Sequence, residues 1–128
     1  MEECIFCKIA EKKIPAHVVY EDGAFIAFLD VNPVAPGHVQ VVPKKHFRWV
    51  WDIPALPDEV PNIGEYFAMV RRVALAVRKA FGTEAVHSKV MGDEVPHAHV
   101  WVYPNPKEVQ GDAKDFEGNA EKIRAVME

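Results

Sequence analysis

The sequence has few cysteines, no excess of basic residues and no long apolar run, and each shortage excludes a class of protein. Its formal charge of -4 and pI near 5.9 give no basic surface for polymeric nucleic acid, so we expect no such partner. No apolar run approaches the roughly 18 residues that a membrane span needs, and the start, Met-Glu-Glu-Cys, does not fit a signal peptide. We therefore expect a cytoplasmic protein without a membrane partner, whose two cysteines are thiols, ligands or redox groups rather than a structural disulfide.

Internal repeats and low-complexity tracts are also missing, and no stretch reads as a linker. A length of 128 residues with 49% apolar content is enough for one hydrophobic core. Nine of the ten prolines lie at 33–36, 43, 54–61 and 96–106, where they punctuate the chain without dividing it. We therefore expect a single domain over residues 1–128, in which 104–128 form a helical C-terminal extension.

Local patterns predict an α+β fold with an antiparallel sheet, because strands outnumber helices and hairpin connections dominate. Glu21-Asp22-Gly23 is a hairpin turn signal, Asn62 and Glu65 have the spacing of a helix capping box, and Gly82 supplies a left-handed helix stop. Residues 44–60 are expected to be irregular. The expected strands are 17–20, 24–29, 39–42, 84–91 and 95–103, and the expected helices are 3–10, 62–81 and 113–127. The apolar face of the long helix is expected to hold Phe67, Val70, Ala74, Val77 and Phe81.

The stretch from Val95 to Tyr103 reads Val-Pro-His-Ala-His-Val-Trp-Val-Tyr and carries two histidines at alternate positions. Alternate side chains of a strand share a face, so the two histidines are expected on the same side as Trp101. A rise of about 3.3 Å per residue separates the imidazoles of His97 and His99 by roughly 7 Å, too far for a direct hydrogen bond. The pair suits two neighbouring sites with different roles, although a polar strand face without a function can show the same pattern.

The N-terminal motif Cys4-x-x-Cys7 has the ligand spacing of a zinc knuckle. A redox role would place the pair after a strand, at the start of a helix, yet only three residues precede Cys4. A closed tetrahedral site needs two further ligands. A structural zinc site is the favoured interpretation, and a pair of buried free thiols is the alternative.

Short motifs in a fixed order resemble the histidine triad family. They are, in order, Cys-Ile-Phe-Cys-Lys-Ile, Ile-Pro-Ala, Tyr-Glu-Asp, Ala-Phe-Leu-Asp, Pro-Gly-His, Val-Val-Pro-Lys-Lys-His and His-Ala-His-Val. Each motif is weak alone, but their order over residues 4–103 is specific. The resemblance implies a five-stranded antiparallel sheet with one long helix, here joined by short N- and C-terminal helices. It also implies a homodimer, for which Trp49, Trp51 or the long helix are candidate contacts.

The resemblance assigns chemistry to the histidines. It implies that His99 attacks phosphorus and that the backbone carbonyl of His97 holds the other ring nitrogen of His99. An imidazole has an unperturbed pKa near 6.5 and is therefore a nucleophile near neutral pH. His46 and His97 would complete the zinc site with Cys4 and Cys7. His38 is expected to be structural, and His17 and His87 are expected to be ordinary strand residues.

The resemblance also implies a nucleotide-binding surface, with an AMP or GMP derivative as partner. Asp30 would accept hydrogen bonds from the ribose hydroxyls. The base pocket would be formed by Ile5, Phe6, Ile9, Ile14, Phe28 and Val31. Plain hydrophobic core is the alternative role for these apolar residues.

The sequence departs from the family pattern at three positions beside the nucleophile. Trp101 replaces the third histidine, and an indole can donate a hydrogen bond but cannot titrate. Asp93 and Glu94 stand where the family usually has glutamine and a small hydroxyl residue that touch phosphate. One interpretation is that the two acids belong to a solvated turn and point outward. The other is that Glu94 serves as the acid in catalysis, a role that Trp101 cannot fill.

Three functions remain open from the sequence. The first is a hydrolase of nucleoside phosphoramidates or dinucleoside polyphosphates, acting through a nucleotidyl-histidine at His99. The second is a nucleotidyltransferase that uses the same intermediate. The third is a zinc-stabilised protein that binds a nucleotide or a partner without catalysis, because Trp101, Asp93 and Glu94 have replaced the reacting groups.

Overall fold

A five-stranded antiparallel sheet forms the centre of the fold. The computed structural model describes residues 4–127, so the first residue of the expected helix 3–10 lies outside the described residues. The strands are β1 (Val18–Glu21), β2 (Phe25–Leu29), β3 (Val39–Pro43), β4 (Val86–Lys89) and β5 (Val100–Pro104). The helices are α1 (Ile5–Ala10), α2 (Ile63–Phe81), α3 (Phe116–Arg124) and the short 3-10 helix η1 (Val50–Asp52). The strand order β1-β2-β3-β5-β4 and the helices confirm the expected α+β class.

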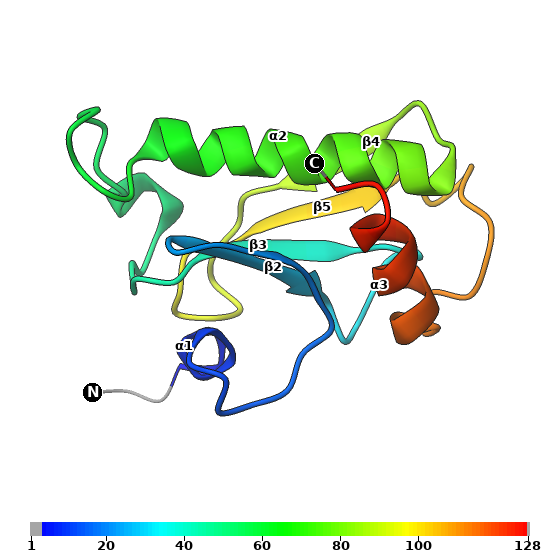
Figure 1. Cartoon of the computed structure of the whole chain (residues 1–128), viewed down its shortest axis with the longest axis horizontal. Coiled ribbons are helices and arrows are strands. Elements are labelled where there is room, and N and C mark those ends of the chain that lie inside the picture. The colour runs from blue at the N-terminus through cyan, green and yellow to red at the C-terminus, as the bar shows by residue number, and fades with distance from the viewer. Residues whose placement is uncertain (1–3, 128) are drawn as a thin grey trace.

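Helices cover both faces of the sheet, so the central strands β2 and β3 are buried along their whole length. In Figure 1, α2 runs along one side of the sheet and α1 lies on the other. Alternate residues of β2 divide between the two layers. Ala27 packs in the larger core with α2, while Ile26 and Phe28 pack in a smaller core with Phe6 of α1. The smaller core therefore fixes α1 against the face of the sheet opposite α2.

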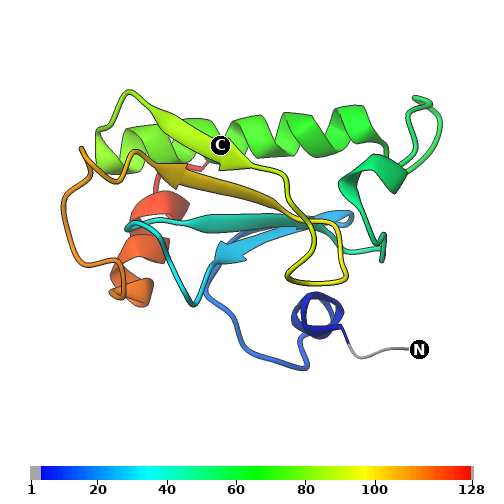
Figure 2. The ribbon, with the colours of Figure 1, turned by 180° about the vertical axis from the view of Figure 1, so that it is seen from behind.

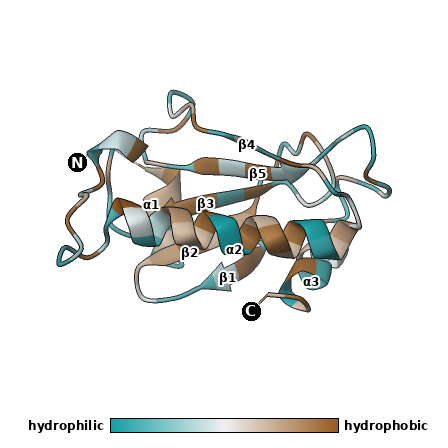
Figure 3. Cartoon of the chain, turned by 90° about the horizontal axis from the view of Figure 1, so that it is seen from above, coloured by the Kyte–Doolittle hydropathy of each residue, from teal (hydrophilic) through white to brown (hydrophobic). Residues whose placement is uncertain are grey.

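The long helix α2 begins and ends where the sequence predicts. The side chain of Asn62 accepts a hydrogen bond from the backbone N–H of Glu65, and the Glu65 carboxylate accepts one from the N–H of Asn62. Gly82 ends the helix in the left-handed conformation, with φ of 65°. Figure 3 shows bands of polar and apolar colour along α2, as expected for a helix with one face on a sheet.

The buried face of α2 is rotated from the predicted one. Phe67 is 37% exposed, whereas the neighbouring Tyr66 is fully buried and donates a hydrogen bond from its hydroxyl to the carbonyl of Val41 at 2.6 Å. The prediction of Phe67 as a core residue was therefore wrong. A tyrosine was overlooked because its hydroxyl needs a partner that only the folded sheet supplies.

The strand that carries the histidines is shorter than predicted. Its ladder with β3 ends at the pair Val41 and Val100, so His97 and His99 lie before β5. The backbone N–H of Ala98 bonds instead to the carbonyl of Phe47, at 2.7 Å. The segment around the histidines thus takes its partners from the chain after β3.

The helix of the C-terminal extension is shorter than the expected 113–127 and contains two residues of poor helix propensity. Gly118 and Asn119 both lie inside α3, which begins after the cap residue Asp115. The Asp115 carboxylate accepts from the N–H of Gly118, and the amide of Asn119 donates to the carbonyl of Asp112. These contacts offset the poor helix propensity of both residues. Across residues 4–127, no helix combines the length and apolar character needed to cross a membrane.

Candidate functional site

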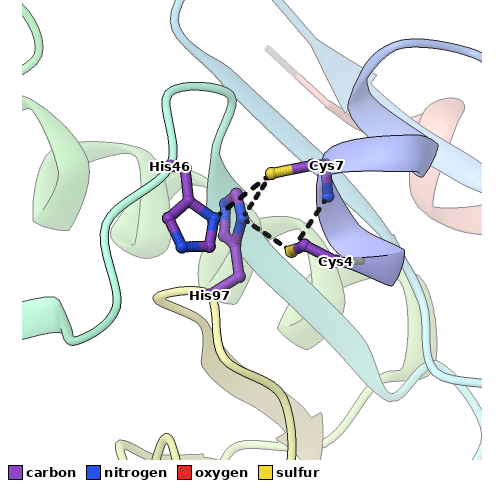
Figure 4. A group of neighbouring side chains, drawn as sticks. All are labelled: Cys4, Cys7, His46 and His97. Atoms are coloured by element: carbon purple, nitrogen blue, oxygen red, sulfur yellow. Dashed lines mark hydrogen bonds between the residues drawn. The ribbon is translucent and has the colours of Figure 1, made fainter. Parts of the chain in front are cut away.

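Four potential metal ligands converge from three separate parts of the chain. Cys4 and Cys7 belong to the start of α1, His46 follows β3, and His97 precedes β5 (Figure 4). Their ligand atoms all lie within 4.8 Å of one another. The Cys7 Sγ is 3.2 Å from the His46 Nδ1, and the Sγ atoms of Cys4 and Cys7 are each 3.4 Å from the His97 Nδ1.

A hydrogen bond to the backbone determines which ring nitrogen of His97 faces the two cysteines. A carbonyl can only accept, so the contact of 2.7 Å between the His97 Nε2 and the Pro43 oxygen places the ring hydrogen on Nε2. The Nδ1 lone pair then faces both sulfur atoms. Burial lowers the pKa of His97 to about 4, which keeps the ring neutral, as a ligand must be. Burial together with Cys4 raises the pKa of Cys7 to about 12, so the metal-free thiol keeps its proton.

The donor set fits a tetrahedral zinc ion. Zinc–sulfur and zinc–nitrogen bonds of about 2.3 and 2.0 Å separate tetrahedral S and N ligands by about 3.5 Å. The S···N contacts of 3.2–3.4 Å in this cluster are close to that separation. The hydrogen bond from His97 to Pro43 is the kind of outer contact that orients metal-ligating histidines. Cys4, Cys7, His46 and His97 could therefore hold a metal ion.

A cavity of about 610 Å³ opens beside this cluster. Much of its lining is apolar and comes from α1, the segment after it and β2, and His99, Glu94 and Trp101 line it as well. The lining residues predicted from the sequence are Ile5, Phe6, Ile9, Ile14, Phe28, Asp30, Val31, Glu94, His99 and Trp101. Among the residues that the structure describes, this lining contains two carboxylates and neither lysine nor arginine.

His99 has the opposite tautomer to His97. Its Nδ1 donates to the backbone carbonyl of His97 at 2.7 Å, which leaves Nε2 as the second nitrogen. The Nε2 lies 3.1 Å from the Oε1 of Glu94, at the cavity, and the ring of Phe6 packs edge-on against the imidazole at 5.3 Å. His99 is only 1% exposed, so its orientation is fixed by packing and by this hydrogen bond.

One proton must lie between His99 and Glu94, since Nδ1 of His99 already carries a hydrogen. Burial alone would raise the pKa of Glu94, but the hydrogen bond with His99, a backbone hydrogen bond and the nearby charge of His99 together outweigh burial, and the pKa lies below its ordinary value. A lowered pKa favours the arrangement in which the proton resides on Nε2 and the carboxylate accepts it. Glu94 is thus placed to exchange a proton with the nitrogen to which the family resemblance assigns the attack.

Polar side chains lie together around Trp101, and of these Asp30 and Gln40 line the cavity whereas His38 does not. The amide of Gln40 donates to the Oδ2 of Asp30 at 2.7 Å, and the ring of His38 lies 4.7 Å from that of Trp101. Within residues 4–127, three buried polar side-chain atoms find no hydrogen-bond partner: His38 Nε2, Gln40 Oε1 and Trp101 Nε1. Buried polar atoms without partners are costly, and two of the three belong to residues that line the cavity, Gln40 and Trp101.

The structure also places residues whose roles the sequence did not predict. His17 precedes β1 and lines the cavity, and it stacks on Phe116 at 5.4 Å, whereas an ordinary strand position was expected. Gln40 was missed, although a single amide in an otherwise apolar strand is a visible signal. Asp93 is not among the lining residues, while Glu94 is. The further lining residues that were not predicted are Pro15, Ala16, Leu29, Asn32 and Val95.

The fold and site thus define an α+β protein with a histidine that lines a cavity, next to a two-cysteine, two-histidine cluster. The HIT domain family model matches residues 11–108. The chain therefore belongs to the histidine triad (HIT) family.

Individual relatives agree with this assignment. The chain is 41% identical over 108 residues to Protein HitA of Neisseria gonorrhoeae, covering 83% of this chain and 99% of that protein. It is 33% identical over 111 residues to the adenosine 5'-monophosphoramidase HNT1 of Saccharomyces cerevisiae, covering 84% of this chain and 66% of that protein. The crystal structure of a Zn-bound histidine triad family protein from Mycobacterium smegmatis superposes with a TM-score of 0.79 at 29% identity, covering 98% of this chain and 93% of that one.

Proposed function

We propose that this protein hydrolyses nucleoside phosphoramidates or dinucleoside polyphosphates through a nucleotidyl intermediate on His99. The main support is the geometry of His99, whose Nδ1 is held by the His97 carbonyl while Nε2 faces the cavity. The phosphoramidase name of the yeast relative is consistent with the phosphoramidate class.

In the first step, Nε2 of His99 attacks the α-phosphorus of the nucleotide. The Nε2–P bond forms and the bond from phosphorus to the leaving nitrogen or oxygen breaks. Before the attack, the proton on Nε2 passes to Glu94, 3.1 Å away, which frees the lone pair of Nε2, and Glu94 then gives the proton to the leaving group. Glu94 thereby supplies the acid that Trp101, at the third triad position, cannot.

In the second step, water attacks the phosphorus of the nucleotidyl-histidine. The water loses a proton to Glu94, the Nε2–P bond breaks, and the nucleoside monophosphate is released. Glu94 then returns the proton to Nε2. The two steps balance, and Glu94 alternates between carboxylate and acid, as microscopic reversibility requires of one group acting in both directions.

The rest of the cavity would recognise the nucleoside. Asp30 would accept the ribose hydroxyls, because a carboxylate binds two hydroxyl donors well. Phe6, Ile9 and Phe28 would contact the base together with the other apolar lining residues. Trp101 would donate its unpartnered Nε1–H to a phosphate oxygen. Asp93, which is exposed on the same turn, is assigned no contact with the nucleotide.

Zinc is the proposed occupant of the cluster of Cys4, Cys7, His46 and His97. Bound zinc would act as a structural cross-link between the three segments that bear these ligands. The mycobacterial relative is Zn-bound, which supports the choice of metal. In this assignment His97 binds metal while His99 remains free of it.

A homodimer is proposed from the open edge of the sheet. β4 is the outermost strand next to β5 and its residues His87, Ser88 and Lys89 are exposed, whereas α3 packs beside β1 at the other edge. An unpaired edge is a template for a second copy. Light scattering of the purified protein tests this, and a monomer at all concentrations would contradict it.

Steady-state kinetics tests the proposed activity. Wild type is expected to release a nucleoside monophosphate from a nucleoside phosphoramidate, and His99→Ala is expected to reduce this to background. Turnover that requires an alcohol or sugar phosphate acceptor would identify a transferase instead. Nucleotide binding without turnover in the wild type would identify the binding protein.

A further inference from the structure

The turn between β4 and β5 carries Glu94 but has little support from the sheet. The ladder of β4 with β5 ends at the pair Lys89 and Trp101. Figure 2 shows this turn running beside the segment that follows β3. One contact between them is a hydrogen bond from the Nη1 of Arg48 to the carbonyl of Gly92, at 2.5 Å. A charged donor makes this one of the stronger kinds of hydrogen bond.

Trp49 also contacts this turn, through Gly92 and through Arg48. The Arg48 guanidinium lies 3.8 Å from the centroid of the Trp49 ring, within the range of a cation–π contact. Gly92 has φ of +93°, and a Cβ built there would lie 2.8 Å from Cε3 of Trp49. The indole therefore lies directly against the backbone of Gly92. Arg48 and Trp49 form one clamp on this residue, two positions before Glu94.

The segment that contains Arg48 and Trp49 also contacts the backbone next to His99, the partner of Glu94. The carbonyl of Phe47 accepts the N–H of Ala98, which is next to His99. Residues 47–49 thus fix both the turn with Glu94 and the backbone beside His99. The Glu94 side chain is 36% exposed, so its own packing contributes little to its position.

We propose that Arg48 and Trp49 are positioning residues that keep the Glu94 carboxylate at the Nε2 of His99. The inference rests on the proposed function for its catalytic consequence, because Glu94 is the proton carrier of that mechanism. Neither residue lines the cavity, so neither touches the nucleotide. Their effect passes through the backbone of Gly92.

Kinetics of Arg48→Met tests the catalytic consequence. We expect kcat to fall about tenfold with little change in KM, because a misplaced proton carrier slows chemistry without weakening binding. Arg48→Lys should recover part of the loss, since a lysine can still donate to Gly92. In a Glu94→Gln background, Arg48→Met should cause no further loss. Independent, additive losses, or a loss confined to KM, would overturn the proposal.

Arg71→Met is the matched control, because Arg71 is exposed on α2 and lines a separate cavity with Leu75 and Lys79. It is expected to leave kcat and KM unchanged. A fall equal to that of Arg48→Met would show a general effect of removing an arginine and would overturn the proposal.

Nitrogen NMR of the His99 ring tests the positioning without any turnover. We expect Arg48→Met and Glu94→Gln to shift the Nε2 resonance in the same direction, while Arg71→Met leaves it unchanged. An Nε2 resonance in Arg48→Met that matches the wild type would overturn the positioning role. Equal turnover by wild type and His99→Ala would instead refute the proposed function, and the NMR result would still decide the role of Arg48.

Discussion

Two histidines only two positions apart present different ring nitrogens because their ring hydrogens have different acceptors. His97 donates from Nε2 to Pro43 and presents Nδ1 to the sulfur atoms, whereas His99 donates from Nδ1 to His97 and presents Nε2 to the cavity. The carbonyl partner fixes the tautomer, and the tautomer decides which nitrogen is available. The sequence predicts two roles from the alternation, but the acceptor of His97 lies in a distant strand and is visible only in the fold.

Glu94→Gln tests the proton carrier. An amide keeps the size of the side chain but cannot carry a proton, so kcat at neutral pH is expected to fall about 10²-fold. In the wild type, the carboxylate must accept the proton from Nε2, so kcat/KM should fall as the pH drops through the lowered pKa of Glu94, below the ordinary value of 4.5. The variant should lack this acid limb.

The thermal midpoint of the Glu94 variant is the control, because substitution of a partly exposed side chain usually changes stability by only about 0.5 kcal/mol. A pH–rate profile identical to that of the wild type would remove Glu94 from the mechanism. That result would not affect the role proposed for His99.

Trp101→Phe isolates the indole N–H. Phenylalanine retains an aromatic ring between His38 and Lys89, which both contact Trp101. If Nε1 donates to phosphate, the variant should lose about tenfold in kcat/KM, the effect of roughly 1.4 kcal/mol from one hydrogen bond. If Nε1 is merely an unpartnered buried atom, activity will be unchanged and stability will be equal or higher.

At the scale of elements, one hydrogen bond joins the long helix to the central strand. Tyr66→Phe removes the buried hydroxyl that donates to Val41 and leaves that carbonyl with one partner fewer. We expect a loss of about 1–2 kcal/mol in the free energy of unfolding, measured by urea denaturation. Phe67→Leu, one position along on the exposed side, should cost less than about 0.5 kcal/mol. Equal costs would contradict the observed orientation of α2.

Element ends were predictable where a local signal defines them. Asn62 with Glu65 and the glycine at position 82 act within one turn of the chain, so the bounds of α2 follow from the sequence. The face of α2 and the start of β5 were less predictable, because both depend on hydrogen bonds between residues that are distant in sequence. Tyr66 of α2 donates to the carbonyl of Val41, and Ala98, before β5, donates to the carbonyl of Phe47. Contacts of this kind depend on the order of strands, which no local pattern contains.

At the scale of the whole molecule, the metal-type cluster and the cavity share a helix. α1 bears Cys7 and also supplies Phe6 and Ile9 to the cavity wall. The Cys-x-x-Cys spacing predicted a metal-type cluster, and the family resemblance predicted that His46 and His97 would lie beside Cys4 and Cys7, as they do. The sequence did not predict the hydrogen bond from Arg48 to Gly92, because an arginine in an irregular segment gives no local indication of its hydrogen-bond partner.

Metal removal tests this connection. Protein purified without added zinc is expected to contain about one zinc per chain, and Cys4→Ser is expected to lose it. Because α1 is then held less firmly, nucleotide affinity should fall more than kcat. Zinc well below one per chain that Cys4→Ser does not change would refute the structural site.

The covalent intermediate is the most direct test of the account. Wild type and His99→Ala are mixed with a nucleoside phosphoramidate, quenched in acid-free denaturant over milliseconds to seconds, and analysed by mass spectrometry of intact protein and peptides. We predict one nucleotidyl group on the His99 of the wild type and none on the variant. An adduct on another residue, or none at any time while nucleotide is bound, would contradict the central role of His99.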